Sequence, residues 1–271
     1  MRSPPTVETG SGPAALLIHG LLGFKEGWGP LPGALAAAGM RAVAVDLPGF
    51  GDAPRLRRTT PEALAAAVAP VLAELAPAAV ISHSLGSQVA MLAAAAHPDR
   101  VGRMAFLAPW VVRRPRHLLP PRTISDVLQL PLVGRPLARL AIARARADPA
   151  RRRGAFLTTL GDPAPTNDPA MAALLEEASD RLLRADLRAI ADWAQSGLAL
   201  DVRPLTARLR GPSLVVVGTL DRVTPPPGAQ WLAGALPGGR LLSLPGVGHF
   251  PHLEAAGEVA DAVAGHLAEA R

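Results

Sequence analysis

The sequence AAVISHSLG at residues 78–86 joins a run of branched apolar residues to a serine with small neighbours. The run predicts a buried strand, and residues 88–96 after it predict a helix. Ser84 therefore lies at a strand-to-helix turn, with Ser82 and Gly86 two residues away on either side. Such a turn needs small neighbours because the strand and helix backbones approach closely, and it holds the serine hydroxyl above the sheet edge. The amide groups at the start of the helix favour negative charge that develops there.

Five other short apolar runs predict further strands, and those of the first part of the chain are expected to be buried on both faces. They are residues 14–18 (AALLI), 41–45 (RAVAV), 103–107 (RMAFL), 213–217 (SLVVV) and 240–243 (RLLS). Helical segments separate the runs of the first part of the chain. This alternation indicates an α/β protein with a doubly wound, mostly parallel sheet.

The strand pattern is absent from residues 111–200, where Pro- and Arg-rich turns and helical stretches such as 171–185 replace it. We expect these residues to form an inserted helical cap. Residues 1–110 and 201–271 are then the core domain, which ends with a helix over residues 258–270.

Composition excludes several classes of protein. The chain has 271 residues, 49% hydrophobic and 18% charged, which excludes a disordered polypeptide. It has no cysteine, which excludes a disulfide scaffold, a cysteine nucleophile and a thiolate metal site. The seven histidines form no His-x-x-x-His pair, so no metal is expected. Residues 46–51 (DLPGFG) lack both common phosphate-loop patterns, so we predict a turn there and no cofactor.

The net charge of +6 is concentrated in one region. Residues 111–153 carry eleven arginines and two aspartates, but no aromatic residue on which bases could stack. We therefore expect no nucleic-acid partner. A basic amphipathic helix on an anionic membrane is one interpretation of this region, and a solvated helix face is the preferred one. The residues concerned are Arg135, Arg139 and Arg146 opposite Leu137, Leu140 and Ile142.

The sequence also bears on the compartment. Residues 1–12 are polar and do not resemble a secretory signal peptide. The most apolar stretch, residues 63–81, is interrupted by Pro70, Glu74 and Pro77, which argues against a transmembrane helix. We expect a cytoplasmic protein that is a monomer or a small homo-oligomer.

Four reactive side chains directly follow predicted strands: His19, Ser84, Asp221 and His249. The carboxyl ends of parallel strands form the ligand crevice of an open sheet. A serine hydroxyl is a weak nucleophile that needs a base, usually a histidine oriented by a carboxylate. The chain order Ser, Asp, His is that of the α/β-hydrolase fold.

The sequence resembles the α/β-hydrolase superfamily, in its cap-bearing serine esterase-like branch, over nearly its whole length. The matching motifs are residues 19–23 (HGLLG), 46–51 (DLPGFG), 82–86 (SHSLG), 218–221 (GTLD) and 248–250 (GHF). In the elbow motif, Ser82 replaces the usual first glycine. Haloalkane dehalogenases and epoxide hydrolases of this fold use an aspartate nucleophile, so the serine here favours acyl transfer.

The resemblance implies a role for each site residue. Ser84 is the nucleophile, His249 the general base and then acid, and Asp221 the orienting carboxylate. The backbone N–H groups of Leu21 and Leu85 form the oxyanion hole. Some relatives carry the acid after the strand that ends at residue 107, but the residues that follow here, APW, contain no carboxylate. His19 resembles the structural histidine that braces the oxyanion loop.

Each assignment has an alternative. Ser84 could cap a helix, Asp221 could form a turn before the prolines, and His252 competes with His249. His83 and His97 are interpreted as structural or solvated. Four aromatic residues are candidates for an apolar pocket wall, with core packing as the alternative: Phe24, Trp110, Trp193 and Phe250.

We therefore predict a serine hydrolase that cleaves small carboxylic esters with hydrophobic acyl groups through an acyl-enzyme. Hydrolysis of thioesters or carbon–carbon bonds and perhydrolysis are alternatives on the same triad. Release of amino-terminal proline would use Glu176, Glu177 or Asp180, and an interfacial lipase would use the Arg-rich region as a lid. From a different class, the fold also serves as a non-catalytic ligand receptor.

Overall fold

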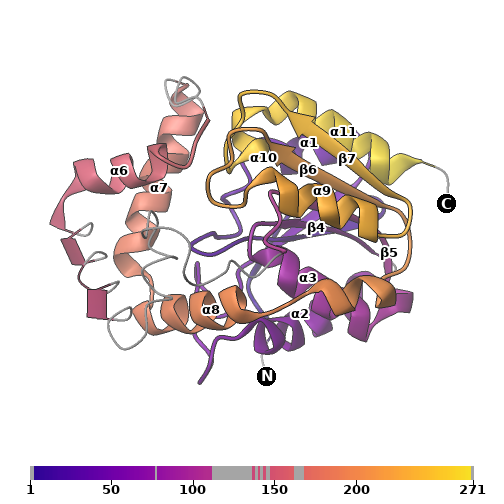
Figure 1. Ribbon diagram of the computed structural model, residues 1–271, viewed down its shortest axis with the longest axis horizontal. Coiled ribbons are helices and arrows are strands. Elements are labelled where there is room, and N and C mark those ends of the chain that lie inside the picture. The colour runs from indigo at the N-terminus through magenta and orange to yellow at the C-terminus, as the bar shows by residue number, and fades with distance from the viewer. Residues whose placement is uncertain are drawn as a thin grey trace.

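The computed structural model describes residues 3–76, 78–111, 136, 137, 140, 143, 144, 147–161 and 168–269. A seven-stranded sheet lies at its centre in the order β1-β3-β2-β4-β5-β6-β7 (Figure 1). The strands are β1 (Thr6–Thr9), β2 (Ala14–Ile18), β3 (Arg41–Val45), β4 (Ala78–His83), β5 (Val101–Leu107), β6 (Ser213–Gly218) and β7 (Gly239–Leu244).

All six predicted strands are present and pair in parallel, which confirms the mostly parallel sheet. Every residue of β2 and β6 is buried, as the continuous apolar runs require. The sequence did not predict β1, which pairs antiparallel with β3 at the sheet edge. Its residues TVET are largely exposed, so an edge strand of this composition gives no apolar signal.

Helices cover both faces of the sheet (Figure 1). One face carries α1 (Leu31–Ala37) and α11 (Ala256–Ala268), which pack against each other. The other face carries α2 (Pro61–Leu75), α3 (Gly86–Ala96) and α9 (Pro226–Ala235). The resulting three layers give the chain two hydrophobic clusters, one on each side of the sheet.

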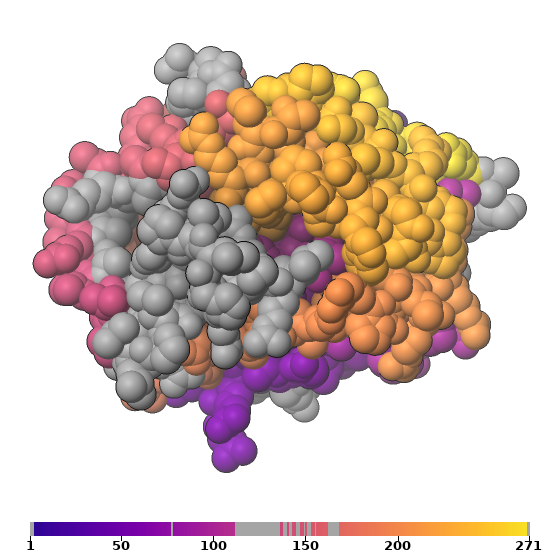
Figure 2. Space-filling view, in the orientation of Figure 1, coloured from indigo at the N-terminus to yellow at the C-terminus, as the bar shows by residue number. Residues whose placement is uncertain are grey.

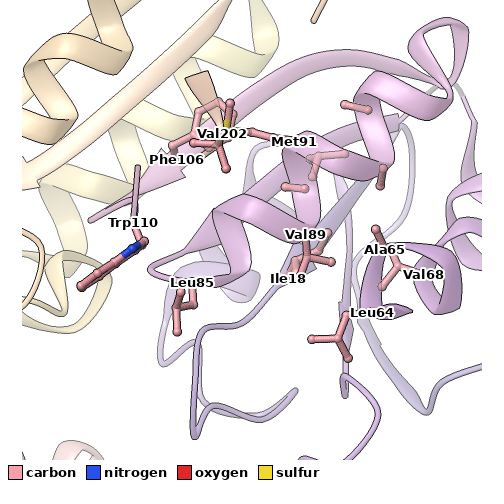
Figure 3. Close-up of a cluster of buried hydrophobic side chains, with 14 of the residues drawn as sticks. Ile18, Leu64, Ala65, Val68, Leu85, Val89, Met91, Phe106, Trp110 and Val202 are labelled. Atoms are coloured by element: carbon pink, nitrogen blue, oxygen red, sulfur yellow. The ribbon is translucent and has the colours of Figure 1, made fainter. Parts of the chain in front are cut away.

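The larger cluster lies on the α2 and α3 side of the sheet. Figure 3 shows Leu64 and Val68 from α2 close to Val89 from α3 and Ile18 from β2. All four side chains are fully excluded from water. Burial of such a side chain contributes about 1.5 to 3 kcal/mol, so this cluster fixes α3, and the turn that precedes it, on the sheet.

Residues 108–212 connect β5 to β6, and we call them the β5–β6 segment. Their described part holds three α-helices, α6 (Pro149–Leu157), α7 (Pro169–Arg184) and α8 (Leu187–Ala199), and the 3₁₀-helix η3 (Arg203–Arg208). Figure 1 shows α6 and α7 to one side of the sheet, whereas α8 lies beside α2. The helical character predicted for this region is confirmed where the structure describes it. Arg135, Arg139, Arg146 and Ile142 of the predicted basic helix lie outside the described residues.

Local sequence explains where two of these helices begin. The side chain of Asp168 accepts hydrogen bonds from two amides in the first turn of α7, and Asp186 does the same for α8. The amphipathic helix α8 buries Ile190, Trp193 and Leu198 in the larger cluster. Its packing therefore ties the end of the β5–β6 segment to the core.

Charged groups fasten α7 to the loops after β2 and β3. The Arg181 guanidinium is 2.9 Å from the Asp52 carboxylate and 3.3 Å from that of Glu26. Lys25, the single lysine of the chain, pairs with both of these carboxylates and with buried Asp46. This network crosses from the β5–β6 segment to the core. None of the helices in the described ranges is both long and apolar enough to cross a membrane.

Candidate active site

Ser84 occupies the turn between β4 and α3 in a left-handed backbone conformation, with φ of +53°. This conformation is costly for a residue with a side chain, so the surroundings must hold it. The Ser84 amide donates to the carbonyl of Leu107 at 3.0 Å, and the Trp110 amide donates to the Ser84 carbonyl at 3.1 Å. A Cβ added at Gly86 would lie 2.4 Å from the His19 carbonyl oxygen. The predicted close approach of backbones around this serine is confirmed.

The structure brings Ser84, His249 and Asp221 together from three separate loops. The Ser84 hydroxyl is 3.0 Å from His249 Nε2, and His249 Nδ1 is 2.9 Å from Asp221 Oδ2. Nδ1 donates to the carboxylate, which leaves Nε2 as an acceptor for the hydroxyl proton. The three residues are 6%, 5% and 4% exposed. This is the hydrogen-bonded arrangement in which an imidazole can take the proton of a serine hydroxyl.

Asp221 is held by its own turn. Its Oδ1 accepts from the amides of Val223 at 2.8 Å and Thr224 at 2.7 Å. Burial raises the pKa of Asp221, but the charge of His249 and hydrogen bonds from His249 and Thr224 outweigh burial and lower it overall. The carboxylate is therefore charged and orients the imidazole.

Thr224 is a site residue that sequence reasoning missed. Its hydroxyl lies 2.6 Å from Asp221 Oδ2 and 3.0 Å from the Ala108 carbonyl oxygen, so its single hydrogen donates to one of them. The sequence held part of the signal, because an aspartate commonly accepts a hydrogen bond from the backbone two residues on, which brings the next residues close to its carboxylate. Thr224 thus links the Asp221 turn to the end of β5.

His19 lies after β2 but does not join this chain of hydrogen bonds. Its Nδ1 donates to the Gly20 carbonyl at 2.7 Å, and its Nε2 accepts from the Leu47 amide at 3.0 Å. Burial lowers the pKa of His19 to about 4, against smaller opposing effects of the Gly20 carbonyl and of Asp46. The ring is therefore neutral and connects the loop after β2 to the loop after β3.

Two further histidines pack against His249. His83 Nε2 donates to the His249 carbonyl at 2.8 Å, and the His83 and His252 ring centroids are 4.8 Å apart. Burial lowers the pKa of His83 well below its usual value and that of His252 to about 3, and nearby imidazoles add to both effects. The neutral His83 ring thus supports the backbone of His249, and the His252 ring packs against His83. The geometry places His249, and not His252, against Ser84.

The predicted oxyanion hole consists of the backbone amides of Leu21 and Leu85, and it stays a prediction. No hydrogen bond joins the Leu21 or the Leu85 amide to another residue in the part of the chain that the structure describes. Leu85 precedes the first turn of α3, and a Cβ added at Gly20 would lie 2.9 Å from Ser84 Cβ. The loop after β2 therefore contacts the serine, and both amides belong to its immediate surroundings.

The four aromatic residues predicted as candidates for a pocket wall lie in different places. Phe250 is partly exposed, and its ring centroid is 5.3 Å from that of His249 and 4.8 Å from that of Phe156 in α6. Trp110 belongs to the larger hydrophobic cluster, together with Leu85 (Figure 3).

The other two lie farther from this site. Trp193 is fully buried, with its ring 5.1 Å from Phe50. Phe24 lies beneath the Arg181 guanidinium at 4.9 Å. Phe250 is thus the candidate in ring contact with His249, and the lining of a pocket stays a prediction.

Two further features of the site are the surface around it and the side chains that could hold a metal ion. In the space-filling view, magenta atoms of the α3–β5 part of the chain are visible at the bottom of a hollow between orange and gold regions (Figure 2). Within the described ranges, no three His, Asp or Glu side chains gather in a way that could hold a metal ion. The groups that are hydrogen-bonded in a chain at Ser84 are a hydroxyl, an imidazole and a carboxylate.

Comparison with known proteins identifies the family to which this chain belongs. Residues 15–262 match the family described as "Alpha/beta hydrolase family". The chain is 31% identical over 211 residues to the pimeloyl-[acyl-carrier protein] methyl ester esterase of Neisseria meningitidis serogroup B, covering 78% of this chain and 76% of the relative. It is 29% identical to the Chromobacterium violaceum protein of the same name, covering 96% of this chain and 97% of that one.

A solved structure shows the same fold. The esterase from Exiguobacterium antarcticum superposes with a TM-score of 0.79 at 17% identity, covering 97% of this chain and 94% of the other. At this identity the likeness bears on the fold alone.

Proposed function

The chain belongs to the alpha/beta hydrolase family, and we propose that it is a serine hydrolase that cleaves carboxylic esters through an acyl-enzyme. The observation that carries the proposal is the buried chain of hydrogen bonds from Ser84 through His249 to Asp221. Its members lie on loops after β4, β7 and β6, at one edge of the sheet. The relatives that are esterases by name support the same reaction.

The proposed reaction begins with attack by the Ser84 oxygen on the ester carbonyl carbon. His249 Nε2 takes the hydroxyl proton, and the charge of Asp221 stabilises the resulting imidazolium. The carbonyl oxygen becomes an oxyanion, which accepts hydrogen bonds from the amides of Leu21 and Leu85. Each such donor lowers the barrier by about 3 to 4 kcal/mol in related chemistry.

Collapse of this tetrahedral intermediate breaks the bond to the alcohol, which leaves with the proton from His249. A water molecule then attacks the acyl group on Ser84 while His249 takes a proton from the water. The second intermediate releases the carboxylic acid and returns the proton to Ser84. The cycle is balanced by ester and water alone, so the proposal includes no cofactor.

We assign the substrate to small esters with a hydrophobic acyl group. Phe250 and Phe156 support this class, because they pack together next to His249 and give that side of the site an apolar character. The curated relatives act on a methyl ester according to their names, so methyl esters are the first alcohol portion to test. Helices α6, α7 and α8 belong to the proposed cap over residues 111–200, which would roof the substrate.

The same three residues could cleave thioesters or carbon–carbon bonds, or form peracids. The relatives' names favour esters among these reactions. A non-catalytic receptor has no need for a nucleophile, a base and an orienting carboxylate in one hydrogen-bonded chain. That arrangement favours the enzyme over the receptor.

The test is covalent labelling with a fluorophosphonate probe, followed by intact mass and peptide mapping. We expect rapid single labelling at Ser84 in the wild type and none in Ser84→Ala. Ser87→Ala is the matched control, because it removes another buried hydroxyl three residues along the chain and should leave labelling intact. Hydrolysis of methyl and p-nitrophenyl esters of increasing acyl length then ranks substrates. A folded wild type that neither labels nor hydrolyses any ester contradicts the proposal.

A further inference from the structure

One carboxylate binds the backbone on both sides of His249. Glu254 Oε2 accepts from the Gly248 amide at 2.8 Å, and Glu254 Oε1 accepts from the Phe250 amide at 3.0 Å. These two amides belong to the residues directly before and after the histidine. Hydrogen bonds to an ionised carboxylate are about twice as strong as those between neutral groups. Glu254 therefore fixes the backbone from which the imidazole projects.

The same carboxylate also binds the β5–β6 segment. Glu254 Oε2 accepts a third hydrogen bond, at 2.7 Å, from the amide of Gly161, a residue 93 positions away in the sequence. The His249 amide in turn donates to the Thr159 carbonyl at 2.8 Å. Residues 159–161 and the loop that carries His249 are thus joined both directly and through one shared acceptor.

The close contact between these two backbones requires glycine at two positions. A Cβ added at Gly161 would lie 2.1 Å from the Gly246 carbonyl oxygen, and one added at Gly248 would lie 2.3 Å from the Gly161 nitrogen. Real Cβ atoms essentially never approach so closely, so a side chain at either position would push the two backbones apart. Glycine at both positions allows the amides to reach the carboxylate.

We propose that Glu254 is a positioning residue that makes the placement of His249 depend on residues 159–161. The inference rests on the proposed function, since it concerns the base of that reaction. Glu254 acts through the backbone, since its hydrogen bonds within the described residues go to the amides of Gly161, Gly248 and Phe250. Phe156 in α6 also contacts Phe250, the residue directly after His249. A ligand that contacts α6 can therefore affect the placement of the imidazole.

The first experiment compares Glu254→Ala and Glu254→Gln with the wild type by steady-state ester hydrolysis. We expect Glu254→Ala to lower kcat about 10- to 100-fold with little change in KM, because a misplaced base slows chemistry and leaves substrate binding intact. Glu254→Gln keeps one carbonyl oxygen as an acceptor, so it should recover part of the loss. Asp261→Ala, which removes an exposed carboxylate of α11, is the matched control and should behave as wild type.

The second experiment changes Gly161, the residue of the β5–β6 segment whose amide donates to Glu254. Gly161→Ala should push residues 159–161 away from the loop and lower kcat in the same way. Because both variants break one connection, the double variant with Glu254→Ala should lose no more than the more damaged single variant. Thermal unfolding of each variant identifies those that do not fold. If Glu254→Ala does not fold, Glu254→Gln and Gly161→Ala test the inference.

The possible failures are distinguishable. If the wild type labels at Ser84 and hydrolyses esters, but both Glu254 variants keep the wild-type kcat, this inference is wrong and the proposed function stands. A rise in KM at unchanged kcat, or fully additive losses in the double variant, also overturns it. If the wild type neither labels nor turns over, the proposed function fails, and the inference fails with it.

Discussion

Two loops of this protein each place a buried histidine just after a strand of the same sheet, His19 after β2 and His249 after β7. The two side chains are almost equally buried, at 3% and 5% exposure. Their partners differ. His19 bonds two backbone groups, a carbonyl and an amide, whereas His249 bonds a hydroxyl and a carboxylate.

The difference shows that burial alone does not assign a role to a histidine. The backbone partners of His19 cannot take or give a proton, and they suit one neutral tautomer of the ring. The partners of His249 suit both the neutral imidazole and the imidazolium, because the hydroxyl can give up a proton and the carboxylate stabilises the imidazolium. Proton transfer is therefore expected in the His249 loop, and structural bracing in the His19 loop.

The largest expected effect comes from removing the carboxylate that His249 bonds, which lies in the loop after β6. Asp221→Asn replaces it with a neutral amide that cannot stabilise an imidazolium, and kcat for ester hydrolysis should fall about 10⁴-fold. The matched variant is Asp46→Asn in the loop after β3, which His19 braces through Leu47; this buried aspartate accepts from the Lys25 and Asp52 amides. We expect Asp46→Asn to lower the free energy of unfolding and to leave kcat nearly unchanged. Equal losses of kcat in the two variants would contradict the distinction.

The sequence predicted most of the fold because the parallel strands β2 to β6 are largely buried. Such strands need uninterrupted apolar runs, and the runs that end at Ile18, Val45 and Leu107 give an unambiguous signal. The edge strand β1 has one side open to solvent, so TVET was not distinguishable from a polar loop. Burial on both faces made β2 to β6 visible, the apolar residues of the largely exposed edge strand β7 revealed it as well, and a polar composition hid β1.

The site was predictable to the extent that its residues follow strands. Ser84, Asp221 and His249 each lie in a loop at the carboxyl end of a parallel strand, so the topology brings them together. Thr224 and Glu254 depend on turn geometry and on contacts between distant segments. Glu254 in particular bonds Gly161 across 93 positions, a contact for which the local sequence has no signal.

The next expected effect concerns acid. Since the pKa of His19 is lowered from 6.5 to about 4, the unfolded chain binds more protons than the folded chain in this interval. The free energy of unfolding is therefore highest above about pH 6.5 and falls as the pH drops toward 4, with roughly 3 kcal/mol lost through His19. His83 and His252, whose pKa values are also lowered, change stability in the same direction. Urea unfolding at a series of pH values measures this loss, and constant stability across the interval would contradict it.

The smallest expected effect comes from His19→Gln, which separates the bracing role from the acid response. The amide of glutamine can replace one of the two backbone hydrogen bonds but not the ring packing against Phe50. We expect unfolding at neutral pH to require about 1 to 2 kcal/mol less, with kcat reduced less than about 10-fold.

Glutamine does not titrate, so the decline in stability toward pH 4 should be shallower in this variant than in the wild type. An unchanged decline would assign the acid response to His83 and His252, beside the proposed base. A loss of kcat as large as that of Asp221→Asn would place His19 in the proton path, and the contrast between the two loops would fail.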